Sequence, residues 1–222
     1  MNKSELKVDW CSHEAAKYAC LNWHYSKCMP VGKIVKIGAW ENDIYIGCVL
    51  FSRGANKNMG KKYRCNQSEC VELTRIALSK HKSFVSEVMA ISIRFLKKSN
   101  PLLKLVVSYA DEDQGHNGGI YQATNFIYDG LSSKSQKVFF NGKWSHKKTV
   151  DDSGVCQENL KKKYVQGKHR YLMPLNKKMR KQILLLSKPY PKRVKQDNSG
   201  NHLGIGGAEP THTLQSKTKG AS

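Results

Sequence analysis

The feature that most constrains the fold is a strand–helix–strand pattern in the middle of the chain. Residues 71–78 alternate between apolar and polar side chains, which predicts a strand. Ser83 is placed to cap a helix over residues 84–99, whose apolar side chains recur at helical spacing. Residues 103–109 are almost continuously apolar, as in a strand that is covered on both faces. Two strands joined by a helix predict a mixed α/β sheet.

Further elements on both sides extend this pattern. Ser12 is placed to cap a helix, and a turn at residues 41–43 joins two β-rich runs into a hairpin. The remaining predicted elements are a strand at 6–10, a helix at 12–24, hairpin strands at 34–40 and 43–51, a helix at 116–124, strands at 126–128 and 138–140, and a helix at 179–186.

Length and composition divide the chain into a core and two extensions. Its 222 residues have room for one well-buried domain. We predict a core over residues 1–140, a basic part packed on it over 141–193, and a flexible tail over 194–222. No stretch reaches the ~20 apolar residues of a transmembrane helix, and no apolar run follows the N-terminus. We therefore expect an intracellular protein whose seven cysteines are reduced thiols.

Positive charge is concentrated in one part of the chain. The 38 Lys and Arg residues exceed the 17 Asp and Glu residues, for a formal net charge of +21. Residues 141–196 alone hold 16 basic and 3 acidic residues. Because such a field attracts polyanions and releases their counterions, we predict that this segment contacts nucleic acid. A merely solubilising basic surface and a membrane-surface patch are the alternatives.

Four segments together resemble the Mom family of phage DNA-modification proteins. They are Asn22–Pro30, Glu72–Leu78, the stretch from Ser108 to Phe126, and Lys168–Lys192. Their order and spacing carry the resemblance over about residues 5–193. It implies a fold like the GNAT acetyltransferases and an enzyme that converts adenine in duplex DNA to N6-carbamoylmethyladenine. This modification shields phage DNA from restriction enzymes in the cytoplasm of the host cell.

One loop departs from the acetyltransferase pattern. Acetyltransferases of this fold bind the pyrophosphate of acetyl-CoA with a glycine-rich loop before the central helix, whereas residues 79–83 contain no glycine. The helix N-terminus still favours an anion, and Lys80, Lys82 and Ser83 are the candidate cofactor-binding residues. The donor is therefore left open between acetyl-CoA and another molecule.

Candidate catalytic residues come from two of these segments. The exocyclic amine of adenine is a poor nucleophile, so an enzyme must position it, remove a proton and stabilise charge on the donor. His24 offers a base, and Tyr25 a surface for stacking or a proton donor; a helix-end packing pair is the alternative. Arg75, in a half-apolar strand, would clamp an anionic donor, or else form a structural ion pair with Glu72 or Asp111.

Two further candidates follow the most apolar strand. Ser108 and Asp111 lie at its carboxyl end, where catalytic groups gather in α/β sheets. Asp111 is a candidate base or a partner that holds His24. The same two side chains, His24 and Asp111, are the speculative ligands of a mononuclear iron. Asp113 is expected to be solvated.

The glycine-rich loop at 115–119 and the helix after it supply candidate substrate contacts. Tyr121 and Asn125 would share one face of that helix, and asparagine can read an adenine edge; helix packing is the alternative. A zinc site at Cys65 and Cys70 lacks a Cys-x-x-Cys pair. The further candidates for contacts to double-stranded DNA are Lys27, Lys161, Lys168 and Arg170.

Three functions fit these residues. The first is a modifier of DNA adenines, as the resemblance implies. The second is an ordinary acyl-CoA-dependent acetyltransferase that acts on a protein or small molecule, for which the basic segment is superfluous. The third is a DNA-binding protein without catalytic activity. The candidate polar residues gather near the ends of predicted helices and strands, and this counts against the third function.

Overall fold

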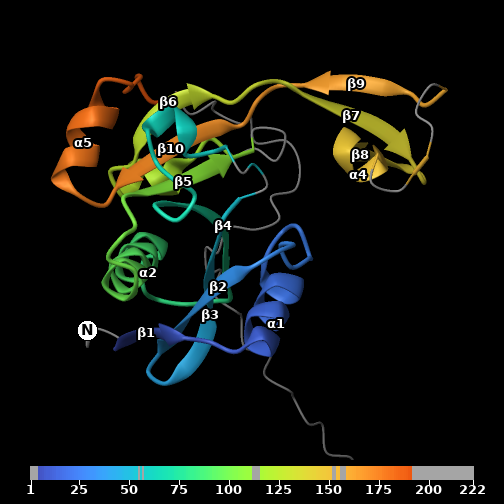
Figure 1. Ribbon diagram of the computed structural model, residues 1–222. Helices are drawn as coiled ribbons and strands as arrows, with labels where there is room; N and C mark the ends of the chain where they lie inside the picture. Colours follow the sequence, from blue (N-terminus) through green and yellow to red (C-terminus); the bar gives the residue numbers. More distant parts are fainter. Residues whose placement is uncertain are drawn as a thin grey trace, which may run out of the picture.

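The computed structural model describes residues 5–54, 56, 58–111, 116–151, 154–155 and 159–191, apart from the side chains of residues 146, 148 and 149. A seven-stranded sheet forms its centre, in the order β1-β2-β3-β4-β5-β10-β6 (Figure 1). The strands of this sheet are β1 (Leu6–Trp10), β2 (Ile34–Glu41), β3 (Ile44–Ser52), β4 (Cys70–Leu78), β5 (Leu105–Ala110), β6 (Ile127–Leu131) and β10 (His169–Pro174).

Helices and a second, smaller sheet complete the chain. The helices are α1 (His13–Trp23), η1 (Lys61–Tyr63), α2 (Val85–Ser99), α3 (Gly119–Ala123), α4 (Lys147–Asp151) and α5 (Lys177–Leu184). The second sheet has the order β8-β7-β9 and contains β7 (Ser135–Phe140), β8 (Lys143–His146) and β9 (Lys162–Val165). Among the described residues, no helix is long and apolar enough to cross a membrane.

The predicted mixed α/β sheet is confirmed. β4 and β5 run parallel and are joined through α2, whereas the other neighbouring strands of the large sheet pair antiparallel. The hairpin of β2 and β3 and the Ser12 cap of α1 also lie where the sequence predicts them. The strand–helix–strand pattern therefore identifies the centre of the fold.

Helices cover both faces of the large sheet. Val49 and Phe51 of β3 pack in the cluster that includes α2, while the intervening Leu50 packs with α1. Likewise Val106 of β5 faces the α2 side, and Leu105 and Val107 pack in the cluster that includes α5. Because side chains alternate between the faces of a strand, the continuous apolar run of β5 is explained by cover on both sides.

The region after residue 140 differs most from the sequence prediction. β10 lies between β5 and β6, so the large sheet crosses the boundary expected at residue 140. β8, α4, β9 and β10 were not predicted, because short strands among lysines give no clear periodicity. α5 begins at Lys177, capped by Asn176, rather than at Met179. The predicted tail over 194–222 lies outside the described residues.

Two other helix predictions also need correction. Ser83 does not cap α2: Phe84 is the N-cap residue, and the Ser83 side chain bonds elsewhere. The helix predicted at 116–124 is the shorter α3, which begins after Gly118. Gly118 has φ +81°, and a Cβ atom there would lie 2.2 Å from the Tyr171 ring, so glycine is required where the loop meets β10.

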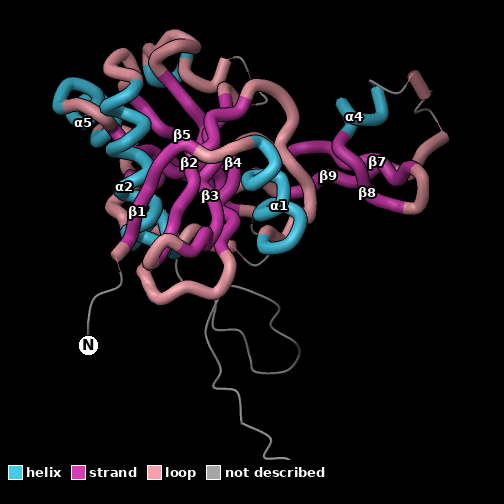
Figure 2. Tube along the Cα trace, turned by 90° about the horizontal axis from the view of Figure 1, so that it is seen from below, coloured by secondary structure: helices cyan, strands magenta, loops and turns pink. Residues whose placement is uncertain are grey.

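The small sheet forms an arm that projects from the core (Figure 2). The chain enters it after β6 and returns at β10, so the arm, defined as residues 132–168, is an excursion between two strands of the large sheet. One face of its sheet is covered by α4, where Val150 and Val138 are both fully buried.

A buried carboxylate ties β6 to its neighbours. Asp129 is 2% exposed and accepts hydrogen bonds from Lys62, Tyr63 and Arg170 at 2.7 Å each. Burial alone would raise the pKa of Asp129, but the hydrogen bonds from Lys62 and Tyr63 and the charge of Arg170 hold it below its ordinary value. Asp129 therefore stays charged and fastens η1 and β10 to β6.

We predict that Asp129→Ala lowers the free energy of unfolding by about 3–5 kcal/mol, because it leaves the Arg170 guanidinium partly buried without its partner. Urea denaturation followed by circular dichroism measures this loss. Glu69→Ala, which removes the partner of the exposed Lys104, is the control and should cost far less. Equal losses in the two variants would contradict the role assigned to Asp129.

Candidate functional site

The candidate site lies where β4 and β5 separate. The two strands pair only from Cys70↔Leu105 to Leu73↔Ser108, and beyond Leu73 the pairing of β4 is with β3. A register shift at Thr74 marks a β-bulge, which bends a strand and is common beside active sites. Ser108 is fully buried, and its Oγ donates to the Leu73 carbonyl at 3.1 Å, so this hydrogen bond closes the last paired step.

His24 reaches this point from the C-terminal end of α1. It is 8% exposed, and its Nδ1 accepts the Ser26 backbone N–H at 3.1 Å. Burial, followed by the charge of Arg75, lowers the His24 pKa from 6.5 to about 4, so the ring is neutral at neutral pH. A neutral ring whose Nδ1 is an acceptor carries its proton on Nε2. With its proton on Nε2, His24 can present an N–H donor, and the role of base that the sequence suggests stays a prediction.

Arg75 follows the bulge in β4 and has an unused hydrogen-bond donor. Its Nη1 donates to the Thr74 carbonyl at 2.9 Å, but its buried Nε has no partner among the described residues. No ion pair joins Arg75 to Glu72 or Asp111 within that same part of the chain. A buried N–H without an acceptor is costly, and it is a feature expected where a bound ligand supplies the acceptor.

Glu72 is a site residue that the sequence suggested only as a partner for Arg75. It lies on the paired part of β4, and burial raises the pKa of its carboxyl, although the charges of Lys168 and Arg75 oppose this. The charge of the Glu72 carboxylate also contributes to the raised pKa of the Tyr121 hydroxyl. The signal for Glu72 was present in the sequence, since a charged residue in a half-apolar strand needs a reason to be there.

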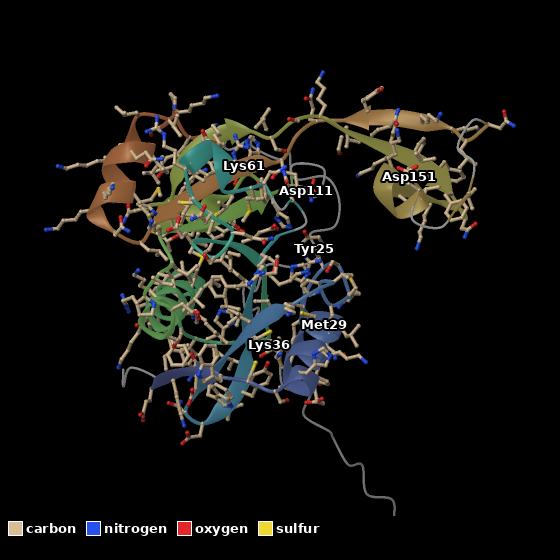
Figure 3. All side chains as sticks on the ribbon, viewed as in Figure 1. Tyr25, Met29, Lys36, Lys61, Asp111 and Asp151 are labelled. Atoms are coloured by element: carbon tan, nitrogen blue, oxygen red, sulfur yellow. The ribbon has the colours of Figure 1, made fainter. Side chains whose placement is uncertain are left out.

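Tyr25 and His116 form the outer wall of the site. The Tyr25 ring is 51% exposed and lies 4.3 Å from the His24 ring and 5.2 Å from the His116 ring, measured between centroids. Figure 3 places Tyr25 and Asp111 near one another on the side of the core from which the arm leaves. The His116 backbone N–H donates to the Asp111 carbonyl at 3.1 Å.

Tyr121 and Asp111 both have partners within the protein, and their predicted roles stay predictions. Burial raises the pKa of Tyr121 to about 12, and its partly buried ring packs against Tyr171 of β10. Asp111 forms an ion pair with Lys168, with 2.8 Å between Oδ2 and Nζ. The structure therefore joins Lys168, one of the expected DNA contacts, to the rim of the site. Asp113 and Gly115 lie outside the described residues.

The expected cofactor-binding residues at the start of α2 face a carboxylate of the protein itself. The backbone N–H groups of Lys82 and Ser83 donate to Glu41 at 2.9 and 2.6 Å, and the Ser83 hydroxyl donates to it at 2.6 Å. Glu41 is only 9% exposed. An internal anion thus fills the position that the sequence assigns to the pyrophosphate of acetyl-CoA, while Lys80 is exposed beside it.

The other expected DNA contacts are dispersed. Lys161 is exposed on the arm, and Lys27 is exposed but donates to the Asn22 carbonyl at 2.7 Å. Asn125 lies beyond α3 in a turn with φ +60°, so it does not share a helix face with Tyr121. The Nε atom of Arg170 is engaged with Asp129, 2.7 Å away, and a contact of Arg170 with DNA stays a prediction.

No group of three His, Cys, Asp or Glu side chains among the described residues is arranged to hold a metal. The Nδ1 atom of His24 is already hydrogen bonded, and Asp111 is paired with Lys168. Cys65 and Cys70 are buried in the cluster beside α5, and burial raises the pKa of Cys70 to about 12. The described residues therefore support neither the speculative iron pair nor a zinc site.

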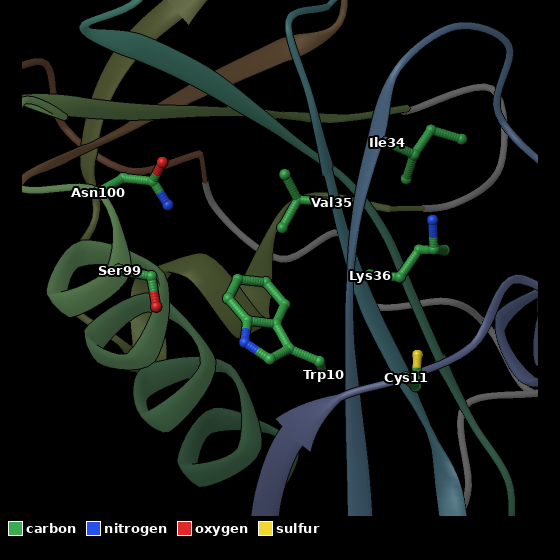
Figure 4. A pocket seen from close by; sticks show the side chains of 7 residues that line it. All are labelled: Trp10, Cys11, Ile34, Val35, Lys36, Ser99 and Asn100. Carbon is green, nitrogen blue, oxygen red and sulfur yellow. The ribbon is translucent and has the colours of Figure 1, made fainter.

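A separate hollow of about 420 Å³ lies between the end of α2 and the edge of the sheet (Figure 4). Trp10, Ile34 and Asn100 are among the residues that line it. It contains none of the titratable groups around Arg75, so we do not assign it to the chemistry.

Comparisons with known proteins add an independent line of information. The sequence model of the Mom protein family matches residues 5–192. A protein of Escherichia phage Mu named "Methylcarbamoylase mom" is 29% identical over 204 residues, covering 85% of this chain and 84% of the relative.

Solved structures also match. A putative acetyltransferase from Acinetobacter baylyi has a TM-score of 0.46 at 12% identity, covering 79% of this chain and 94% of that one. A Bacillus subtilis acetyltransferase in complex with CoA has a TM-score of 0.45 at 14% identity, covering 78% of this chain and 100% of that one.

We predict that His24 titrates near pH 4 and that Arg75→Gln raises this pKa toward 6.5, because the variant removes a nearby positive charge. The His24 imidazole resonances in NMR spectra measure both values. Because the folded pKa lies below the unfolded one, the stability that His24 contributes should be lost as the pH falls from about 6.5 through 4. Arg94→Gln, on α2, is the control. A wild-type pKa near 6.5 would contradict this account.

A second prediction concerns Glu41. Acetyl-CoA in millimolar excess should not raise the melting temperature of the wild-type protein, because its anion position at α2 is already filled. Glu41→Gln should melt at a lower temperature, since it weakens charge-assisted hydrogen bonds. Thermal unfolding with and without the ligand tests both statements, and clear stabilisation of the wild-type protein would contradict the first.

Proposed function

Because this chain belongs to the Mom protein family, we propose that it is an enzyme that modifies DNA and converts adenine to N6-carbamoylmethyladenine. The name of the phage Mu relative, a methylcarbamoylase, supports transfer of such a group. The protein would act on phage DNA in the host cytoplasm, and the modified adenine would block host restriction enzymes. The observation that assigns the proposed reaction to particular residues is the buried Nε of Arg75, which lacks an acceptor among the described residues.

In the proposed reaction, Arg75 and His24 act on the donor. A carbamoylmethyl group carries a carbonyl oxygen, and that oxygen would accept the unused Arg75 N–H. The Nε2–H of the neutral His24 is a second donor close to the Arg75 charge. Two N–H groups already fixed by burial stabilise developing charge better than mobile water does. This assignment makes Arg75 and His24 the groups that bind and polarise the donor.

Glu72 is the proposed proton acceptor. In the transfer step, a bond forms between adenine N6 and the methylene carbon of the donor, and the bond to the leaving group breaks. N6 must lose a proton, which passes to a carboxylate near the site. Glu72 fits because its raised pKa makes it a stronger base than an exposed glutamate. Asp111 is less suited, since Lys168 is bonded to it.

Tyr25 is the proposed platform for the adenine. N6 cannot be reached inside a closed site while the base is paired, so the nucleotide must leave the stack. The half-exposed Tyr25 ring, which contacts the His24 and His116 rings, offers a flat surface for the flipped base. The alternative of a CoA-dependent acetyltransferase is less favoured, because Glu41 occupies the expected anion position.

We predict that Arg75→Gln and Glu72→Gln each lower the modification of plasmid DNA by about 100-fold or more, because each removes a group that acts in the transition state. Nucleoside mass spectrometry of plasmid from expressing cells measures the amount of modified adenosine. Tyr25→Phe keeps the stacking surface and should retain most activity, whereas Tyr25→Ala should not. Arg94→Gln serves as a control of equal charge change.

Two outcomes would overturn these assignments. Full modification by folded Arg75→Gln or Glu72→Gln would remove those residues from the chemistry. Absence of any new adenosine species with the well-expressed wild-type protein, in cells that also carry the phage genome, would overturn the proposed activity itself.

A further inference from the structure

The arm has a structure that its own folding does not explain. Its sheet shares no strand with the large sheet, and its fully buried apolar side chains among the described residues are Val138 and Val150. So small an apolar cluster contributes little to the stability of the core. An excursion of this size between β6 and β10 therefore calls for a function outside the core.

Within the part of the chain that the structure describes, the face of the arm sheet opposite α4 carries both aromatic and cationic groups. Phe139 and Trp144 are opposite each other on β7 and β8, each 39% exposed, with ring centroids 5.4 Å apart. Lys163 of β9 places its Nζ 4.5 Å from the centre of the Trp144 ring. Side chains alternate across a sheet, so Val138 faces α4 while these three residues face away from it.

The net positive charge of the arm indicates which class of partner it binds. Residues 132–168 contain nine lysines and three acidic residues. Lys161, Lys162 and Lys163 follow one another at the start of β9, and all three are exposed. Lysines beside exposed aromatic rings are the combination that binds nucleic acid, since the cations meet phosphates and the rings meet sugars and bases. A β-ribbon can also enter the major groove of a duplex.

Hydrogen bonds and close packing join the two strands at the root of the arm, and one side chain of the root reaches the candidate site. The Ser132 N–H donates to the Lys168 carbonyl at 2.8 Å, and the Lys168 N–H donates to Ser132 Oγ at 2.9 Å. A Cβ atom on Gly167 would lie 1.7 Å from the Ser132 carbonyl oxygen, so the two strands of the root are in close contact. The Lys168 side chain then reaches Asp111 at the rim of the site.

We propose that the arm is a second duplex-binding element, separate from the chemical site, which grips the DNA beside the target adenine with the Lys163–Trp144–Phe139 face. This inference rests on the proposed function in taking duplex DNA as the partner. The hydrogen-bonded root of the arm would set the distance between the bound duplex and Tyr25. The arm then supplies affinity, while the groups around Arg75 supply chemistry.

The test compares two triple variants of equal charge. One replaces Lys161, Lys162 and Lys163 of the arm by Gln, and the other replaces the exposed Lys177, Lys178 and Lys181 of α5, which lies at the opposite end of the molecule in Figures 1 and 2. Fluorescence anisotropy with a labelled duplex, at salt concentrations from about 50 to 200 mM, gives Kd and its salt dependence.

We expect the arm variant to bind about tenfold or more weakly and to lose about 2 from the slope of log K against log salt. Lys162 pairs with Val138 and lies on the α4 side, which leaves Lys161 and Lys163 for phosphate contacts that contribute about 0.9 each. The α5 variant should change the slope by less than one. Trp144→Ala should weaken binding about fivefold or more without changing the slope, because it removes a contact and no charge. Circular dichroism checks that all variants are folded.

Each other outcome overturns a stated part. Equal losses in the two triple variants, or no loss in either, overturn the arm as a specific contact, whatever the modification assay shows. Tighter, arm-dependent binding of a structured RNA overturns duplex DNA as the partner. If wild-type protein binds duplex through the arm but no adenine is modified, the proposed function fails and the arm inference stands.

Discussion

The site depends on how briefly β4 and β5 pair. Four parallel steps, ending where Ser108 donates to the Leu73 carbonyl, hold the two strands together before the bulge at Thr74 turns β4 toward β3. Beyond Leu73 and Ser108 the pairing of β4 with β5 does not continue. Because it stops, charged and polar side chains of β4 lie beside the end of α1 and the loop after β5.

Burial gives these side chains their properties. Burial and then the charge of Arg75 lower the pKa of His24 to about 4 and keep its ring neutral at neutral pH. Burial also raises the pKa of Glu72. A poorly hydrated site disfavours additional charge. This one rule accounts both for the neutral His24 ring, a hydrogen-bond donor, and for the raised pKa of the Glu72 carboxyl, a proton acceptor. The Asp129 cluster shows the opposite case, in which three donors keep a buried carboxylate ionised.

Residue-level prediction succeeded where a short stretch of sequence holds the whole signal. The Ser12 cap, the β2–β3 hairpin and the β4–α2–β5 unit follow from local periodicity. Ser83 shows the limit: a serine before a helix is a good cap, yet here a buried Glu41 from another strand takes both its N–H and its hydroxyl. Arg170 is similar, because its partner Asp129 is 41 residues away in sequence.

The sequence by itself determined the fold class, the family and the set of polar residues from which the site is built, because periodicity, motif order and residue type are local properties. The tertiary structure alone decided that β10 enters the large sheet, that the lysine-rich segment forms an arm, and that Lys168 reaches Asp111. These features depend on contacts between distant segments and on burial. Both are set by the packing of the whole chain, so no window of sequence contains them.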